Sequence, residues 1–89
     1  MEVTEVKIYP VDEKRVKAYA SIVFDNCFIV KDLKIIHGPN KLFVAMPSKK
    51  MKDGKFRDTV HPLNTETRRM IEGAVIKAYE MEMKKQKKS

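Results

Sequence analysis

Cationic side chains gather in one short stretch of the chain, MPSKKMKDGKFRDTVHP, which covers residues 46–62. Within residues 49–57, five cations are offset by one carboxylate, that of Asp53, so the local net charge is +4. Cations at this density capture polyanions, because each phosphate that they neutralise releases condensed counterions. The pattern predicts a nucleic-acid-binding site made of Ser48, Lys49, Lys50, Lys52, Lys55 and Arg57.

The chemistry of this stretch leaves alternatives open. Lysines hold a phosphate backbone without reading bases, so they do not distinguish DNA from RNA. Arg57 suits a bidentate contact with a guanine edge or a phosphate, but it can equally pair with Asp58 or Glu66. The charge also has a simpler interpretation, because a charged loop protects an exposed hairpin from aggregation.

Catalytic and metal chemistry find little support elsewhere in the sequence. Ser48, Asp58 and His61 could be drawn as a triad, but no nucleophile elbow accompanies them. The two histidines, His37 and His61, lack helical spacing and neighbouring cysteines, so we expect no metal site. His61 is instead expected to anchor the turn before the helix through a backbone hydrogen bond. We predict no enzyme, no cofactor and no small-molecule substrate.

Cys27 is the only cysteine, which excludes an internal disulfide and a zinc site built on several thiolates. It stands at the start of an apolar run, and we expect it to be a small buried hydrophobe.

The size and charge of the chain set further limits. Its 89 residues suffice for one domain with a thin core, so we expect a homodimer that completes it. The net charge of +7 favours anionic partners. The N-terminus, MEVTEVKIYP, lacks the features of a signal peptide, and no apolar run approaches the roughly 20 residues of a membrane span. We therefore expect a cytoplasmic protein without a membrane partner.

The elements that position the cationic stretch follow from hydrophobic periodicity. Alternating apolar and polar residues predict strands over residues 3–9, 16–24, 27–36 and 56–61, with an irregularity at LKII in the third. The continuous apolar run LFVAM, residues 42–46, predicts a central strand. Asp25-Asn26 predicts a two-residue hairpin turn, and Asp53-Gly54 predicts the reversal before the last strand.

One helix is expected after these strands. Asn64 or Thr65 can cap it, and Glu66 suits the positive end of its dipole. The stripe predicted to cover the sheet is Met70, Ile71, Ala74, Val75, Ala78 and Met81 or Glu82. The fold class is thus α+β: a mostly antiparallel sheet of about five strands with one C-terminal helix packed on it, formed by residues 1–83 as a single domain. Residues 84–89 are expected to be a basic, flexible tail.

Three tyrosines bear on the kind of nucleic acid. Tyr9, Tyr19 and Tyr79 are candidates for stacking on unpaired bases. A tyrosine on a sheet is more often a cross-strand packing residue or part of a dimer seam, so the sequence favours this role over stacking.

Several motifs resemble the stage V sporulation protein G (SpoVG) family. They are MEVTEVKIYPVDE, ASIVFDNCFIVKDLKII, LFVAMPSKK and DGKFRDTVHPLNTETR, in register across residues 1–80, with the most specific block at residues 42–64. The resemblance implies a small cytoplasmic bacterial regulator that binds DNA, and RNA in some members, and that is associated with sporulation, septation and cell division. It also implies a strand-rich domain with a C-terminal helix and a strand-mediated dimer, and no enzymatic activity.

The chain departs from that family at two places. Met51 and Lys52 stand where a Thr-Pro pair is usual, and Lys55 stands where an acid is common, so the loop is more basic. The C-terminus carries Lys84, Lys85, Lys87 and Lys88 where many members have an acidic tail. A competing hypothesis is a dimeric protein-interaction module without direct nucleic-acid binding, whose charges serve solubility.

Overall fold

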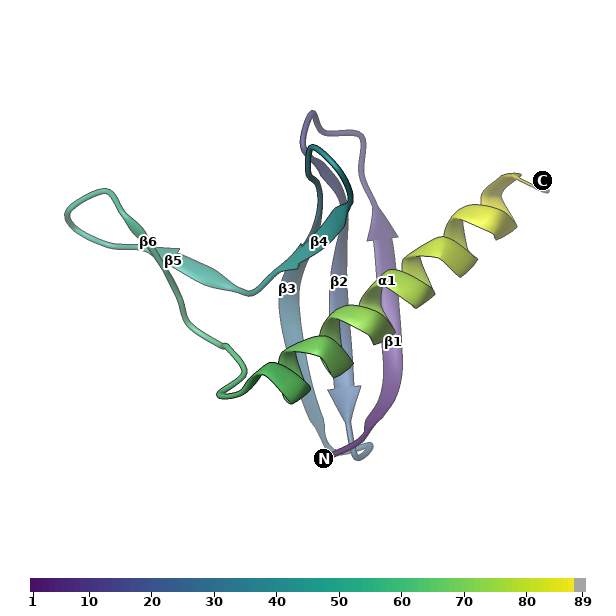
Figure 1. Cartoon of the computed structure of the whole chain (residues 1–89), viewed down its shortest axis with the longest axis horizontal. Coiled ribbons are helices and arrows are strands. Elements are labelled where there is room, and N and C mark those ends of the chain that lie inside the picture. Colours follow the sequence, from purple (N-terminus) through teal and green to yellow (C-terminus); the bar gives the residue numbers. More distant parts are fainter. Residues whose placement is uncertain (88–89) are drawn as a thin grey trace.

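The computed structural model describes residues 1–87, and four of their strands form one antiparallel sheet (Figure 1). The strands are β1 (Val3–Pro10), β2 (Val16–Phe24), β3 (Phe28–His37) and β4 (Leu42–Ala45), in the spatial order β1-β2-β3-β4. Helix α1 (Thr65–Lys87) packs on one face of this sheet. The predicted α+β class is confirmed.

The turn between β2 and β3 follows the predicted chemistry. Asp25 and Asn26 have φ of 50° and 54°, a conformation that Asp and Asn tolerate better than most residues. Cys27 closes the turn by donating its N–H to the Phe24 carbonyl at 3.0 Å. Because Phe24 pairs with Phe28, the loop contains three residues, one more than predicted. Cys27 therefore sits in the loop and is exposed, so the prediction of a buried cysteine is wrong.

The sheet contains bulges that keep its apolar side chains on one face. Between the pairs Ala20–Leu33 and Ile22–Val30, β3 has one residue more than β2, and Asp32 adopts a φ of 68° there. A second shift lies opposite LKII, where the irregularity was predicted. A bulge adds a residue without a partner and so resets which face the next side chains occupy.

Strand β4 occupies an edge of the sheet, so the prediction of a central strand is wrong. Its apolar run does not mean burial on both faces. Val44 is buried against the core, whereas Phe43 points to the other face and is 40% exposed. A four-residue apolar run cannot by itself distinguish a central strand from an edge strand that carries an exposed aromatic side chain.

Helix α1 begins where the capping residues predicted. The Asn64 side-chain oxygen accepts a hydrogen bond from the Thr67 N–H at 2.7 Å, and the Asn64 carbonyl accepts one from Arg68 at 3.2 Å. Ile71 and Val75 of the predicted stripe are buried, whereas Met70 and Met81 are exposed. Ile76 and Tyr79 pack against the core in their place.

The C-terminal segment expected to be a flexible tail is helical through Lys87, while residues 88–89 lie outside the described part.

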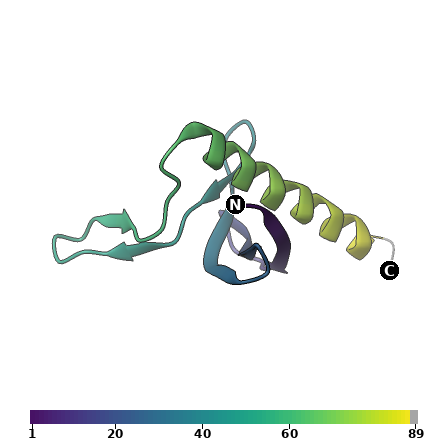
Figure 2. The same cartoon turned by 90° about the horizontal axis from the view of Figure 1, so that it is seen from below.

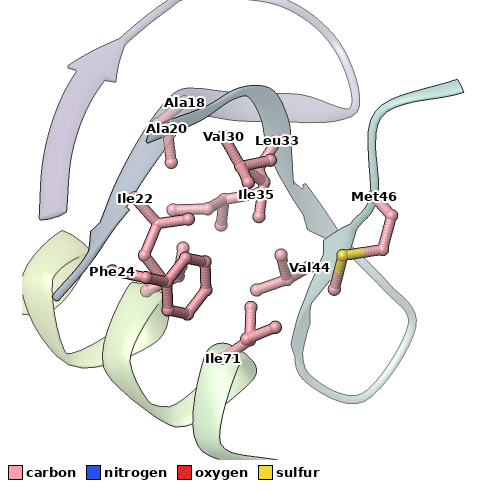
Figure 3. Close-up of a cluster of buried hydrophobic side chains, with 11 residues drawn as sticks. Ala18, Ala20, Ile22, Phe24, Val30, Leu33, Ile35, Val44, Met46 and Ile71 are labelled. Atoms are coloured by element: carbon pink, nitrogen blue, oxygen red, sulfur yellow. The ribbon is translucent and has the colours of Figure 1, made fainter. Parts of the chain in front are cut away.

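A single apolar cluster joins the sheet to the helix (Figure 3). Alternate residues of β2 supply one wall of it, and Ile71 and Val75 supply the other. The buried side chains are Ala18, Ala20, Ile22, Phe24, Val30, Leu33, Ile35, Val44, Met46, Ile71 and Val75. Burying apolar area at about 25 cal/mol per Å² is the main term that stabilises such a fold. Among residues 1–87, no helix is long and apolar enough to cross a membrane.

The cationic stretch forms a hairpin of its own, outside the four-stranded sheet. Strands β5 (Ser48–Lys50) and β6 (Phe56–Asp58) pair only with each other in the described structure. The hairpin projects away from the sheet and the helix (Figures 1 and 2). The strand predicted over residues 56–61 is shorter than expected, and β5 was not predicted, because three residues rich in lysine carry no hydrophobic period.

Candidate nucleic-acid interface

Residues 48–58 are here called the basic hairpin. Two hydrogen bonds join the two chain segments at its base. The Pro47 carbonyl accepts from the Thr59 N–H at 2.8 Å and from the Thr59 hydroxyl at 3.2 Å. Met46 and Pro47 are themselves buried against the core. The core thus fixes where the hairpin leaves the domain, although every residue from Ser48 to the tip and back is exposed.

The tip of the hairpin is shaped by Asp53 and Gly54, as the sequence predicted. Gly54 has a φ of +85°, a conformation that is strained for residues with a Cβ. The Met51 N–H donates to the Lys55 carbonyl at 2.7 Å, and the Gly54 N–H donates to the Met51 carbonyl at 3.0 Å. The Asp53 carboxylate accepts the Lys55 N–H at 3.0 Å, so a backbone group already engages the only acid of the turn.

The strand register divides the predicted site residues between two faces. Lys49 pairs with Arg57, while Ser48 pairs with Asp58 and Lys50 pairs with Phe56. Because successive strand residues point to opposite faces, Lys49 and Arg57 share one face, and Ser48 and Lys50 share the other. Asp58 lies on the face opposite Arg57, which disfavours the pairing of these neighbours that the sequence left open. Lys52 and Lys55 lie in the turn.

The pair of Lys49 and Arg57 concentrates positive charge at one point. Like charges directly opposite each other on neighbouring strands destabilise a ribbon. A phosphate bound between them would neutralise both, and the guanidinium group can hold phosphate oxygens in a bidentate manner. Side chains of Lys49, Arg57 and the turn border a hollow of about 450 Å³. The side-chain hydrogen bonds of the described residues include none from the ammonium groups of these lysines.

One residue of this surface was not among the predicted site residues. Phe56 is 69% exposed and lies beside Lys50 on the second face of the hairpin. The sequence contained a signal for this exposure. Phe56 follows a Gly-Lys turn and begins the short strand FRD, which offers no other apolar side chain to pack against it. An exposed aromatic ring beside a cation suits contact with the sugars or bases of a nucleic acid.

His61 lies beyond the hairpin, in the segment that leads to α1. Its Nδ1 is 3.1 Å from the Pro62 carbonyl oxygen, so the predicted backbone hydrogen bond is confirmed. Across residues 1–87, no group of three or more His, Cys, Asp or Glu side chains is arranged to hold a metal ion.

Comparison with known proteins matches nearly the whole chain. A sequence model of the SpoVG family matches residues 1–81. The chain is 66% identical over 84 residues to a Bdellovibrio bacteriovorus protein named "Putative septation protein SpoVG", covering 94% of this chain and 78% of that protein. Proteins of the same name from Anaeromyxobacter sp. (strain Fw109-5) and Caldicellulosiruptor bescii are 53% and 54% identical, covering 96% and 90% of this chain and 88% and 92% of theirs.

Proposed function

The chain belongs to the SpoVG family, and from this premise we propose that it is a cytoplasmic nucleic-acid-binding regulator that grips phosphate backbones with its basic hairpin. The relatives' names associate the family with septation. The observation that carries the proposal is the exposure of all five cations on a ribbon that projects from the domain.

The shape of the hairpin favours duplex DNA as a ligand. The major groove of B-DNA admits a two-stranded β-ribbon. Cations on both faces and at the tip of the ribbon can meet the phosphates on both walls of a groove. In that position Arg57 can reach a guanine edge or a phosphate, and Phe56 on the opposite face can contact sugars.

The proposal includes a homodimer that joins through strand β4. The outer side of β4 pairs with no strand in the described structure, and an unpaired edge offers a row of backbone donors and acceptors. A two-fold pairing of β4 strands would duplicate the basic hairpin and so suit two half-sites. Equilibrium sedimentation checks this: we expect twice the monomer mass of 10.4 kDa, and a single 10.4 kDa species at micromolar concentration would contradict it.

Removing hairpin charge tests the proposed function directly. In K49A/K50A/K52A we expect duplex affinity to fall roughly 100-fold near 0.1 M salt, and the slope of log K against log salt to fall by about 2.7, at about 0.9 for each lost contact. The matched control removes the same charge from exposed lysines elsewhere, K14A/K41A/K77A. Equal losses in the two variants would show that binding follows net charge and not the hairpin.

A second candidate function is binding of a partner protein, and an apolar hollow on the domain favours it. An apolar hollow of about 170 Å³ opens between the sheet and the start of α1, lined by Phe24, Phe28, Met46, Val60 and Ile71 among others. Apolar hollows of this kind accept anchoring side chains of a partner protein. Absence of any DNA or RNA binding at physiological salt, together with capture of a protein partner, would favour this function over the first.

A further inference from the structure

The four-stranded sheet has one face that helix α1 leaves open. Alternate residues of β2 point toward the helix and are buried, among them Ala18, Ala20 and Ile22. The residues between them, Tyr19 and Ser21, therefore point to the opposite face. Figure 2 shows α1 on one side of the sheet and no other described element over the opposite side.

Two tyrosines lie side by side on this open face. Tyr9 of β1 pairs directly with Tyr19 of β2, and Tyr19 pairs with Lys34 of β3. Tyr9 is 53% exposed. The Tyr19 hydroxyl lies 3.4 Å from a Glu13 carboxylate oxygen, a contact that orients its ring. The tyrosines are thus cross-strand partners, as one interpretation of the sequence had it, and the ring of Tyr9 stays accessible.

Lysines lie close to the tyrosine pair, together with acidic side chains. Lys7 pairs with Ser21 in the next row, and Lys31 lies at the bulge of β3. With Lys34 they make three lysines near the two rings. Three acids lie there as well: Glu13 at the Tyr19 hydroxyl, Asp32 beside Lys31, and Glu5 one row further along β1. Between Lys7, the tyrosines and Lys31 the face is hollowed by about 340 Å³, with the small side chain of Ser21 among its lining residues.

Flat aromatic side chains beside cations suit unpaired nucleic acid better than a duplex. Base–aromatic stacking needs a base that has left its own stack, and it accepts any sequence because every base has a flat face. In some RNA-binding domains, aromatic residues on the open face of a four-stranded sheet stack two or three bases. A sheet face is too broad to enter a groove of B-DNA, which further separates this surface from the basic hairpin.

We propose that the open face of β1–β3 binds single-stranded nucleic acid, with a base stacked on Tyr9 and the adjoining phosphates held by Lys7, Lys31 and Lys34. This surface is separate from the basic hairpin and does not depend on it. The chain then has two modes of contact, one through the hairpin for duplex backbones and one through the sheet for unpaired strands.

The test compares Tyr9→Leu with Tyr9→Phe in the full chain, with a fluorescein-labelled 12-mer of thymidine as the probe. Phenylalanine keeps the ring, whereas leucine removes it and still suits a strand. We expect Y9L to bind the 12-mer about 5- to 150-fold more weakly, the range for one lost stacking contact, and Y9F to bind within about 2-fold of the unchanged protein. Duplex affinity is expected to stay unchanged in both.

A second measurement keeps the test decisive if Y9L folds poorly. The chain has three tyrosines and no tryptophan, so intrinsic fluorescence reports tyrosine alone. Titrating the unchanged protein with the unlabelled 12-mer is expected to quench this emission. No quenching at saturation would overturn the proposal, as would Y9L binding like the unchanged protein.

The controls separate this proposal from its alternatives. K49A/K50A/K52A is expected to lose duplex affinity, while the 12-mer still quenches its tyrosine fluorescence. The proposed roles of the hairpin and of the sheet face can therefore be refuted independently. Equal weakening in Y9F and Y9L would assign the effect to the hydroxyl and overturn the stacking role. A loss of the dimer in Y9L, without a change in 12-mer affinity per chain, would assign the face to contact between copies and overturn it as well.

Discussion

The sheet–helix domain and the basic hairpin are built by opposite physical means. In β2, alternate side chains are apolar and buried, and they pack against Ile71 and Val75 of the helix. In the hairpin, every side chain of β5 and β6 is exposed, and the cross-strand pair Lys49–Arg57 is repulsive. Burial stabilises the domain, whereas the hairpin presents exposed positive charge that a polyanionic ligand can neutralise.

This contrast predicts that substitutions in the hairpin leave the fold of the sheet–helix domain intact. A two-stranded hairpin is at best marginally stable on its own. Here two hydrogen bonds between Pro47 and Thr59 hold the base of the hairpin, and Pro47 is itself buried where the chain leaves β4. Met51, Lys52 and Lys55 lie in the hairpin and are exposed, so substitutions at these positions change no buried contact.

The largest expected difference in unfolding free energy is between two substitutions of a large side chain, one in each region. Leu33 is 1% exposed, and Leu33→Ala is expected to lower the free energy of unfolding by about 2–5 kcal/mol, because it leaves a cavity. Phe56→Ala removes a larger side chain, but it is expected to change the free energy of unfolding by less than about 0.5 kcal/mol, because Phe56 is exposed. Urea unfolding monitored by circular dichroism measures both. A loss above about 2 kcal/mol for Phe56→Ala would show that the hairpin is buried in an assembly.

A smaller difference in unfolding free energy is expected between substitutions in the two turns that contain positive φ, at Asn26 and at Gly54. Asn26→Ala is expected to cost about 1 kcal/mol of unfolding free energy, because alanine resists the left-handed conformation and this turn belongs to the sheet. Gly54→Ala meets no atom within 4 Å, so it adds backbone strain alone. Its strain is expected to distort the hairpin and weaken duplex binding a few-fold, while unfolding stays within about 0.5 kcal/mol.

Asn26→Gly is the control for the first turn and is expected to lose little stability, since glycine accepts the same φ. If Gly54→Ala lowered global stability as much as Asn26→Ala, the two regions would unfold as one unit and the contrast between them would fail.

The sequence predicted most of the domain because burial leaves a periodic pattern. The alternation over residues 16–24 gave β2 its bounds, and Asn64 marked the start of the helix. The prediction failed at Cys27, where one extra loop residue moved a cysteine out of the strand. It also failed at β4, where the apolar run over residues 42–46 predicted a central strand and the strand lies at an edge. Such errors arise where tertiary packing, and not local pattern, decides exposure.

The candidate site was predictable in composition but not in arrangement. All six expected residues lie together on the hairpin, because they are close in sequence. The division into a Lys49–Arg57 face and a Ser48–Lys50 face depends on the register of two three-residue strands, which no hydrophobic period specifies. The open sheet face with Tyr9 and Tyr19 depends on pairing between strands and on which face the helix covers.

The most direct measurement of the central claim replaces the hairpin itself. Pro47 and Thr59 are joined by a 2.8 Å hydrogen bond, so Gly-Asn-Gly can bridge them in place of residues 48–58. We predict that this chain unfolds cooperatively within about 1 kcal/mol of the unchanged protein and binds duplex DNA at least about 100-fold more weakly near 0.1 M salt. Retention of the original duplex affinity and salt slope would contradict the account.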